Sequence, residues 1–183
     1  SSPNTPGLRE LQDVDHLSSI LAECKMMSDR KGGGKPLLLK LSPDYNDDGI
    51  IASAQMAMRR GIDGFVATNT TLHRPVPRNA TSRSVFAESG GLSGRPLQAR
   101  SKEVIRLLYG EVGSSVPIVG VGGIDSADTA WQAVTSGASL LQLYSALVFN
   151  GPSVISGIVK GLKKRVKENG FLGIEEAVGL DIP

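Results

Sequence analysis

The segment PIVGVGGIDS, residues 117–126, decides the fold. Its first five residues form a short apolar run with β-branched side chains, which is typical of a buried strand. A run of small residues follows at 120–123, and Asp125 and Ser126 then provide the capping chemistry with which helices begin. A strand that passes through a glycine turn directly into a helix is the repeating unit of a parallel α/β protein.

The same order of strand, turn and helix occurs four times along the chain. The expected strands are Pro36–Leu41, Gly64–Thr68, Pro117–Val121 and Leu140–Leu143. The expected helices are 46–60, 101–109, the segment that Ser126 caps, and 152–167, with an earlier helix from Val14 to about Ser28. An unusually long loop separates the second strand from its helix. Because the apolar residues of Pro36–Leu41 are contiguous rather than alternating, we expect a strand that is buried on both faces.

Four parallel strands with right-handed crossovers leave two architectures, a doubly wound sheet or a β/α barrel. Periodicity does not decide between them. The barrel is favoured because polar and glycine residues follow each strand, where a barrel builds its site. A full barrel has eight strands, so we predict an α/β chain that supplies four β/α units, about the C-terminal half of a (β/α)8 TIM-type barrel. Residues 1–183 form part of one domain in this prediction, and we expect further residues before Ser1.

The composition excludes several classes of function. The 20 basic and 18 acidic residues are interspersed and sum to +2, which argues against nucleic acid as a partner. Cys24 is the single cysteine, so the chain has no internal disulfide. His16 and His73 have no companions at metal-ligand spacing, so we predict no metal site. The sequence has no apolar run long enough to span a membrane.

Glycines and hydroxyl groups after the third and fourth strands point to an anion site. The run GVGG at 120–123 and the helix start at Asp125 and Ser126 offer backbone N–H groups, as phosphate sites do. The pair Tyr144-Ser145 adds donors from the next strand end. The alternative is a tight strand-to-helix turn that binds nothing.

Two features point to chemistry after the first and second strands. Lys40 is a charged residue within an apolar strand, where it would pair with an anion, unless it snorkels from an edge strand. Residues 68–71, TNTT, carry amide and hydroxyl groups that can hydrogen-bond a planar substrate with a carboxylate. Ordinary turn chemistry explains the same four residues.

Six motifs in order resemble the C-terminal half of dihydroorotate dehydrogenase. They are SSPNTPGLRELQ at 1–12, LLLKLSPD at 37–44, TNTT at 68–71, GGLSGRPL at 90–97, PIVGVGGI at 117–124 and LLQLYSAL at 140–147. The resemblance covers nearly the whole chain, and the spacing of its motifs suits successive strands of a barrel.

The resemblance implies an enzyme of pyrimidine (UMP) biosynthesis that oxidises dihydroorotate to orotate with FMN as hydride acceptor. It assigns Ser2 the role of general base, which removes a proton from C5 of the substrate while hydride leaves C6. The implied substrate-binding residues are Asn4, Thr5, Asn69 and Thr70. The implied FMN-binding residues are Lys40, Thr68, Gly94, Gly122, Gly123, Tyr144 and Ser145.

A serine at the base position resembles class 2, the membrane-associated enzymes that pass electrons to a quinone. Membrane association then comes from an N-terminal region absent from this sequence, at the mitochondrial inner membrane of a eukaryote or the cytoplasmic membrane of a bacterium. The missing half of the barrel is a further implied partner, and we expect residues 1–183 alone to be inactive and to retain no FMN. Two alternatives remain, a phosphate-binding β/α barrel isomerase or lyase without flavin, and a non-catalytic half-barrel.

Overall fold

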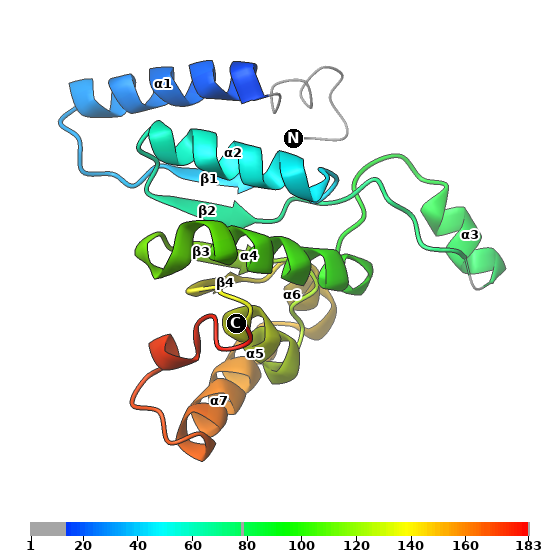
Figure 1. Cartoon of the computed structure of the whole chain (residues 1–183). Coiled ribbons are helices and arrows are strands. Elements are labelled where there is room, and N and C mark those ends of the chain that lie inside the picture. Colours follow the sequence, from blue (N-terminus) through cyan, green and yellow to red (C-terminus); the bar gives the residue numbers. More distant parts are fainter. Residues whose placement is uncertain (1–13, 78, 183) are drawn as a thin grey trace.

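A computed structural model describes residues 14–77 and 79–182. Four short strands alternate with helices along this part of the chain (Figure 1). The strands are β1 Leu38–Leu41, β2 Gly64–Ala67, β3 Ile118–Val121 and β4 Leu140–Gln142. The α-helices are α1 Val14–Arg30, α2 Asp47–Arg59, α3 Ala80–Phe86, α4 Gln98–Val112, α5 Ala127–Thr135, α6 Ser145–Asn150 and α7 Ser153–Glu168. The 3-10 helices are η2 Arg95–Leu97, η3 Gly113–Ser115 and η4 Ile174–Ala177.

The four strands form one parallel sheet in the order β1-β2-β3-β4. A doubly wound sheet reverses its strand order at a switch point, and this sheet does not reverse. Right-handed crossovers between consecutive neighbours place every connecting helix on the same face of the sheet. The strand order therefore favours the barrel over the doubly wound sheet. It confirms the prediction that the chain supplies four β/α units of a barrel.

The helices follow one another across the molecule in chain order, from α1, which packs on α2, to α7, which packs on α5 (Figure 1). Their apolar faces and one face of the sheet form a single core. Leu41, Phe65 and Ile118 point into this core from three neighbouring strands and are fully buried. Burial of such side chains stabilises the fold by about 1.5–3 kcal/mol each.

The opposite face of the sheet is exposed at its two edge strands, and here one prediction is wrong. β1 alternates between exposed and buried residues, so it is not buried on both faces as expected. Leu38 is 37% exposed, and Leu140 on β4 is 60% exposed. The physical reason is that the core helices pack on the other face, so among the described residues these two side chains stay largely open to solvent.

Side-chain caps begin helices α2, α3 and α5, of which the sequence predicts the one at Ser126. The Asn46 side chain accepts a hydrogen bond from the Gly49 N–H at 2.9 Å and caps α2. Ser126 and Thr129 form a capping box at the start of α5. Each cap satisfies backbone donors that have no partner within the helix, so each fixes the residue at which its helix begins.

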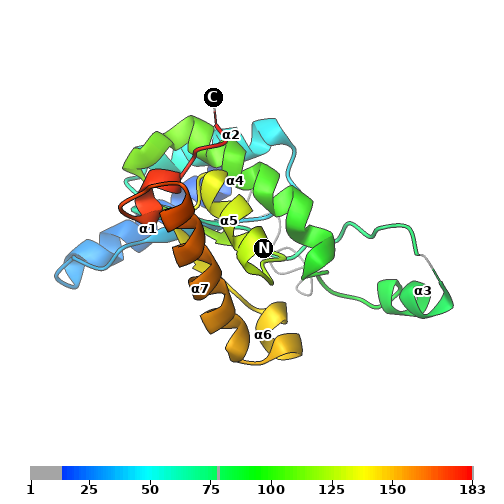
Figure 2. The ribbon, with the colours of Figure 1, turned by 90° about the horizontal axis from the view of Figure 1, so that it is seen from below.

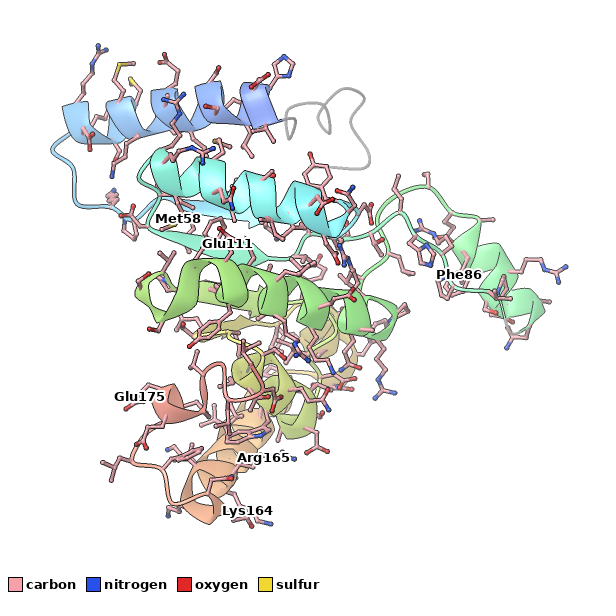
Figure 3. All side chains as sticks on the ribbon, in the orientation of Figure 1. Met58, Phe86, Glu111, Lys164, Arg165 and Glu175 are labelled. Atoms are coloured by element: carbon pink, nitrogen blue, oxygen red, sulfur yellow. The ribbon has the colours of Figure 1, made fainter. Side chains whose placement is uncertain are left out.

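The long loop after β2 contains elements that the sequence reasoning did not predict. Helix α3 extends from the rest of the molecule on an arm, as both views show (Figure 1 and Figure 2), and η2 follows it. Arg74 ties the two ends of the arm, because its guanidinium donates to the carbonyls of Thr71, Phe86 and Gly90. Figure 3 shows Phe86 on this arm, far from Arg165 on α7. The Arg165 guanidinium lies over the Trp131 ring and so joins α7 to α5.

Candidate functional site

A cleft of about 540 Å³ lies at the carboxyl ends of the strands. Every described residue for which the sequence predicts substrate or cofactor binding lines it. They are Lys40, Thr68, Asn69, Thr70, Gly94, Gly122, Gly123, Tyr144 and Ser145. Ser93, Leu97 and Gln142 also line the cleft and were not predicted. Residues from all four strand ends and from the GGLSGRPL loop therefore meet in one place.

Close backbone contacts build the glycine end of this cleft. Gly123 has a φ of 73°, and a Cβ added to it would lie 2.9 Å from the Gly94 carbonyl oxygen and 2.7 Å from Gln98 Cβ. A Cβ on Gly94 would in turn lie 3.3 Å from Ser145 Oγ. Only glycine fits where main chains approach this closely. Gly94, Gly123 and Ser145 therefore form one concave surface of backbone and hydroxyl groups, which we call the glycine cradle.

Two side chains from α4 hold the strand end behind the cradle. Gln98 donates from Nε2 to the Gly123 carbonyl at 3.2 Å, and Ser101 donates from Oγ to the Val121 carbonyl at 2.6 Å. Gly122 packs against Ser101, with a φ of 131°. The β3 strand end is thus fixed from the helix side, and its other side faces the cleft.

The start of α5 differs from its predicted role as part of the anion site. The Thr129 hydroxyl accepts hydrogen bonds from the N–H groups of Asp125 and Ser126, at 2.9 and 3.0 Å. These two donors are therefore used inside the helix cap. Asp125 also accepts from Arg95 at 2.5 Å, and this hydrogen bond and charge raise the pKa of Arg95 above its ordinary value.

Lys40 lines the cleft from β1, but the argument that singled it out is wrong. The sequence reasoning placed its ammonium in a strand buried on both faces, whereas Lys40 lies on the exposed face of β1. Among the described residues nothing covers Lys40 on that face of the sheet, so solvent reaches its side chain there. The side chain supplies a positive charge at the rim of the cleft. It lies on β1, at one end of the sheet, whereas the glycine cradle follows β3 and β4 at the other end.

The segment Thr68–Thr70 continues the sheet beyond β2. The Thr68 N–H donates to the Val121 carbonyl at 2.7 Å, and the Asn69 N–H donates to the Leu41 carbonyl at 2.8 Å. The peptide between Ala67 and Thr68 is cis. Thr68 is buried and its hydroxyl donates to the Asn69 carbonyl, while Asn69 and Thr70 are half-buried at the cleft wall.

Asp44 anchors the residues that follow this segment, and the sequence reasoning missed it. Its carboxylate accepts from the Thr71 hydroxyl and, at 3.0 Å, from the Leu72 N–H. No local pattern in the sequence marks it, because its two partners lie 27 and 28 positions further along the chain.

Arg100 on α4 holds the loop that carries Asp44. Its guanidinium donates to the carbonyls of Pro43 and Tyr45, at 3.0 and 2.6 Å, and forms ion pairs with Asp47 and Glu103. Partial burial opposes the charge, but the hydrogen bonds to the two carboxylates outweigh it. The pKa of Arg100 is therefore raised, and the group is a permanent cation at any physiological pH.

Ser2, Asn4 and Thr5 lie outside the described residues, so their predicted roles stay predictions. Within the described ranges, no three His, Cys, Asp or Glu side chains gather as a metal site would require. No helix in the same part of the chain is long and apolar enough to cross a membrane.

The singly wound sheet and the polar cleft at its carboxyl edge define a class, the (β/α)8-type barrels with their site at the strand ends. The family model described as dihydroorotate dehydrogenase matches residues 1–166. The chain belongs to the dihydroorotate dehydrogenase family.

The chain is similar to curated relatives whose names carry the quinone acceptor of class 2. Dihydroorotate dehydrogenase (quinone) of Trichodesmium erythraeum is 44% identical over 98% of this chain and 48% of its own length. The protein of the same name from Nautilia profundicola is 44% identical over 100% of this chain and 48% of its own length. The chain thus spans about half the length of these relatives, and neither supports the isomerase or lyase alternative.

A solved structure supports the barrel assignment. The crystal structure of the Eimeria tenella enzyme in complex with ferulenol superposes with a TM-score of 0.90 and 33% sequence identity. It covers 100% of this chain, which covers 53% of that structure. A close match to about half of a barrel agrees with the four β/α units seen here.

Proposed function

We propose that this chain carries half of the catalytic barrel of a quinone-linked dihydroorotate dehydrogenase, which oxidises dihydroorotate to orotate in pyrimidine (UMP) biosynthesis. The observation that carries the proposal is the meeting of nine predicted ligand residues in one cleft of a chain from this family. Those residues come from five separate sequence segments, so their convergence is not a consequence of sequence proximity. We further propose that residues 1–183 belong to one FMN-binding domain.

Family membership implies a flavin, and the residues of the cleft fit FMN. The glycine cradle offers backbone and hydroxyl groups where the close approach of the Gly94 and Gly123 main chains leaves no room for a Cβ between them, and such groups suit a phosphate. In this proposal Gly94, Gly122, Gly123 and Ser145 hold the phosphate, and Tyr144 lies beside it. When bound, FMN supplies the hydride acceptor for substrate oxidation.

Lys40 and Thr68 hold the ring system in this proposal. Both line the cleft on the β1 and β2 side, away from the glycine cradle. The exposed Lys40 ammonium contributes a positive charge that favours electron-rich groups nearby. The rigid β2 strand end, held by hydrogen bonds to both neighbouring strands, keeps the wall of the cleft in place.

Asn69 and Thr70 bind the substrate from one side, and Asn4 and Thr5 from the other. Amide and hydroxyl groups can donate to the carboxylate and the ring carbonyl groups of orotate. Ser2 acts as general base and removes the C5 proton. A serine hydroxyl is a weak base on its own, so this role requires a hydrogen-bonded relay to Thr5 or water.

The electron acceptor in this proposal is a quinone, as the names of the two curated relatives state for those proteins. A quinone dissolves in the membrane, so the enzyme works at a membrane surface. That surface is the mitochondrial inner membrane in a eukaryote or the cytoplasmic membrane in a bacterium. Membrane attachment and the other half of the barrel come from outside the residues described here.

Anaerobic titration tests the proposed function. The full-length protein, which supplies both halves of the barrel and is the protein used in every FMN experiment below, is purified with FMN. It is mixed with dihydroorotate in the absence of oxygen, and the flavin absorption is recorded. We expect the yellow colour to bleach, and to return when a soluble quinone is added. A colourless protein, or a flavin that dihydroorotate leaves oxidised, contradicts the proposal and favours a flavin-free barrel enzyme.

A further inference from the structure

The substrate-facing segment of the cleft is anchored from behind. Asn69 and Thr70 line the cleft, while the next two residues, Thr71 and Leu72, line a different cavity that Asp44 also lines. The Asp44 carboxylate accepts from the Thr71 hydroxyl and from the Leu72 N–H. Thr71 is 6% exposed, so its hydroxyl depends on partners within the protein.

The anchor is itself fixed on both sides. The Arg100 guanidinium donates to the carbonyls of Pro43 and Tyr45, the residues that flank Asp44. The Arg100 side chain is 27% exposed and also pairs with Asp47 and Glu103, so its position is set by four partners. Arg100 on α4 thus fixes the main chain on both sides of Asp44, and the Asp44 carboxylate in turn accepts hydrogen bonds from the end of the cleft segment.

We propose that Asp44, held by Arg100, is a positioning residue that aims Asn69 and Thr70 at the substrate. This inference rests on the proposed function, because it takes a pyrimidine carboxylate as the ligand of that cleft wall. Asp44 does not line the cleft, so it acts through Thr71 and Leu72 and not by touching substrate. The glycine cradle, which takes the phosphate end of FMN in the proposed function, is built by other loops.

Two variants remove the anchor at its two ends. Asp44→Ala removes the acceptor of both hydrogen bonds. Thr71→Val removes one donor with little change in shape, and it also removes the acceptor of the His73 N–H at 2.9 Å. The matched control is Asp63→Ala. The Asp63 carboxylate also accepts a hydrogen bond from a backbone N–H, that of Leu37, at 2.7 Å. Asp63 directly precedes β2, so it lies at the amino-terminal ends of the strands, away from the cleft.

Orotate affinity and amide exchange are the two measurements, both on the FMN-loaded protein. Calorimetric titration with orotate gives the Kd, and hydrogen–deuterium exchange follows the peptide that contains 68–73. We expect Asp44→Ala and Thr71→Val to weaken orotate binding between about tenfold and a hundredfold, because small misplacements of binding groups are costly. Exchange at 68–73 becomes faster, FMN content stays at the wild-type level, and Asp63→Ala matches wild type in both measurements.

The outcomes separate the inference from the function on which it rests. If wild type binds orotate and Asp44→Ala binds it equally well, the positioning role is wrong. If Asp63→Ala weakens orotate binding as much as Asp44→Ala, the effect is general destabilisation, and the role is again wrong. If wild type binds no orotate, the proposed function fails, and unchanged exchange at 68–73 in Asp44→Ala then overturns the anchor itself. Should Asp44→Ala not fold, Thr71→Val decides the question by the same criteria.

Discussion

Substitution of Gly123 by alanine tests the glycine cradle most sharply. At a φ of 73° a non-glycine residue costs about 1–2 kcal/mol. The new Cβ would also lie 2.9 Å from the Gly94 carbonyl oxygen, a backbone atom that cannot rotate away. Overpacking of this kind costs about 1–3 kcal/mol. The total penalty is therefore about 2–5 kcal/mol, and relief requires Gly94 to move away from Gly123.

Gly170→Ala is the matched control for this substitution. Gly170 has a φ of 72°, and an added Cβ there would meet no atom within 4 Å, so it carries the backbone cost without the contact. FMN titration of the apoprotein by flavin fluorescence gives the affinity, and urea unfolding gives the stability. We expect both variants to lose stability, and Gly123→Ala alone to lose FMN affinity, by at least about tenfold. Equal FMN affinity in the two variants would refute the cradle.

Three further substitutions, and Leu180→Ala as a control for the last of them, test other parts of the molecule. Ser2→Ala should slow flavin reduction by dihydroorotate at least about a hundredfold in stopped-flow measurements while FMN stays bound, and undiminished reduction removes Ser2 from the role of base. Ser126→Ala should lower the free energy of unfolding, measured in urea, by about 1 kcal/mol, because α5 loses its cap. An unchanged free energy of unfolding would show that this cap does not stabilise the protein. Leu108→Ala should cost about 2–5 kcal/mol, since Leu108 is fully buried. Leu180→Ala, at 54% exposed, should cost less than about 1 kcal/mol, and equal losses would contradict the observed core.

The sequence predicts the four units well because each is encoded locally. The glycine turn and Ser126 define where β3 ends and α5 begins, and the structure confirms both. The choice between barrel and doubly wound sheet is not local, since it depends on strand order. Helix α3 was missed because its seven residues contain no buried side chain, so no apolar stripe marks it.

The candidate site was predictable where the motifs carry it and not where contacts cross between loops. The glycines and the TNTT segment were found, and they line one cleft. The burial argument for Lys40 failed because it assumed a sheet covered on both faces. Asp44 and Arg100 were missed because their contacts join residues 28 and about 55 positions apart, and no local pattern encodes such a separation.

The most direct test of the account is a crystal structure of the protein with its flavin. The account predicts FMN in the cleft, with its phosphate against Gly94, Gly123 and Ser145 and its ring system beside Lys40. That arrangement would establish the cofactor, its orientation and the side from which Asn69 reaches the substrate. A flavin bound elsewhere, or bound with its phosphate at Lys40 and its ring at the glycine cradle, would contradict the central claim.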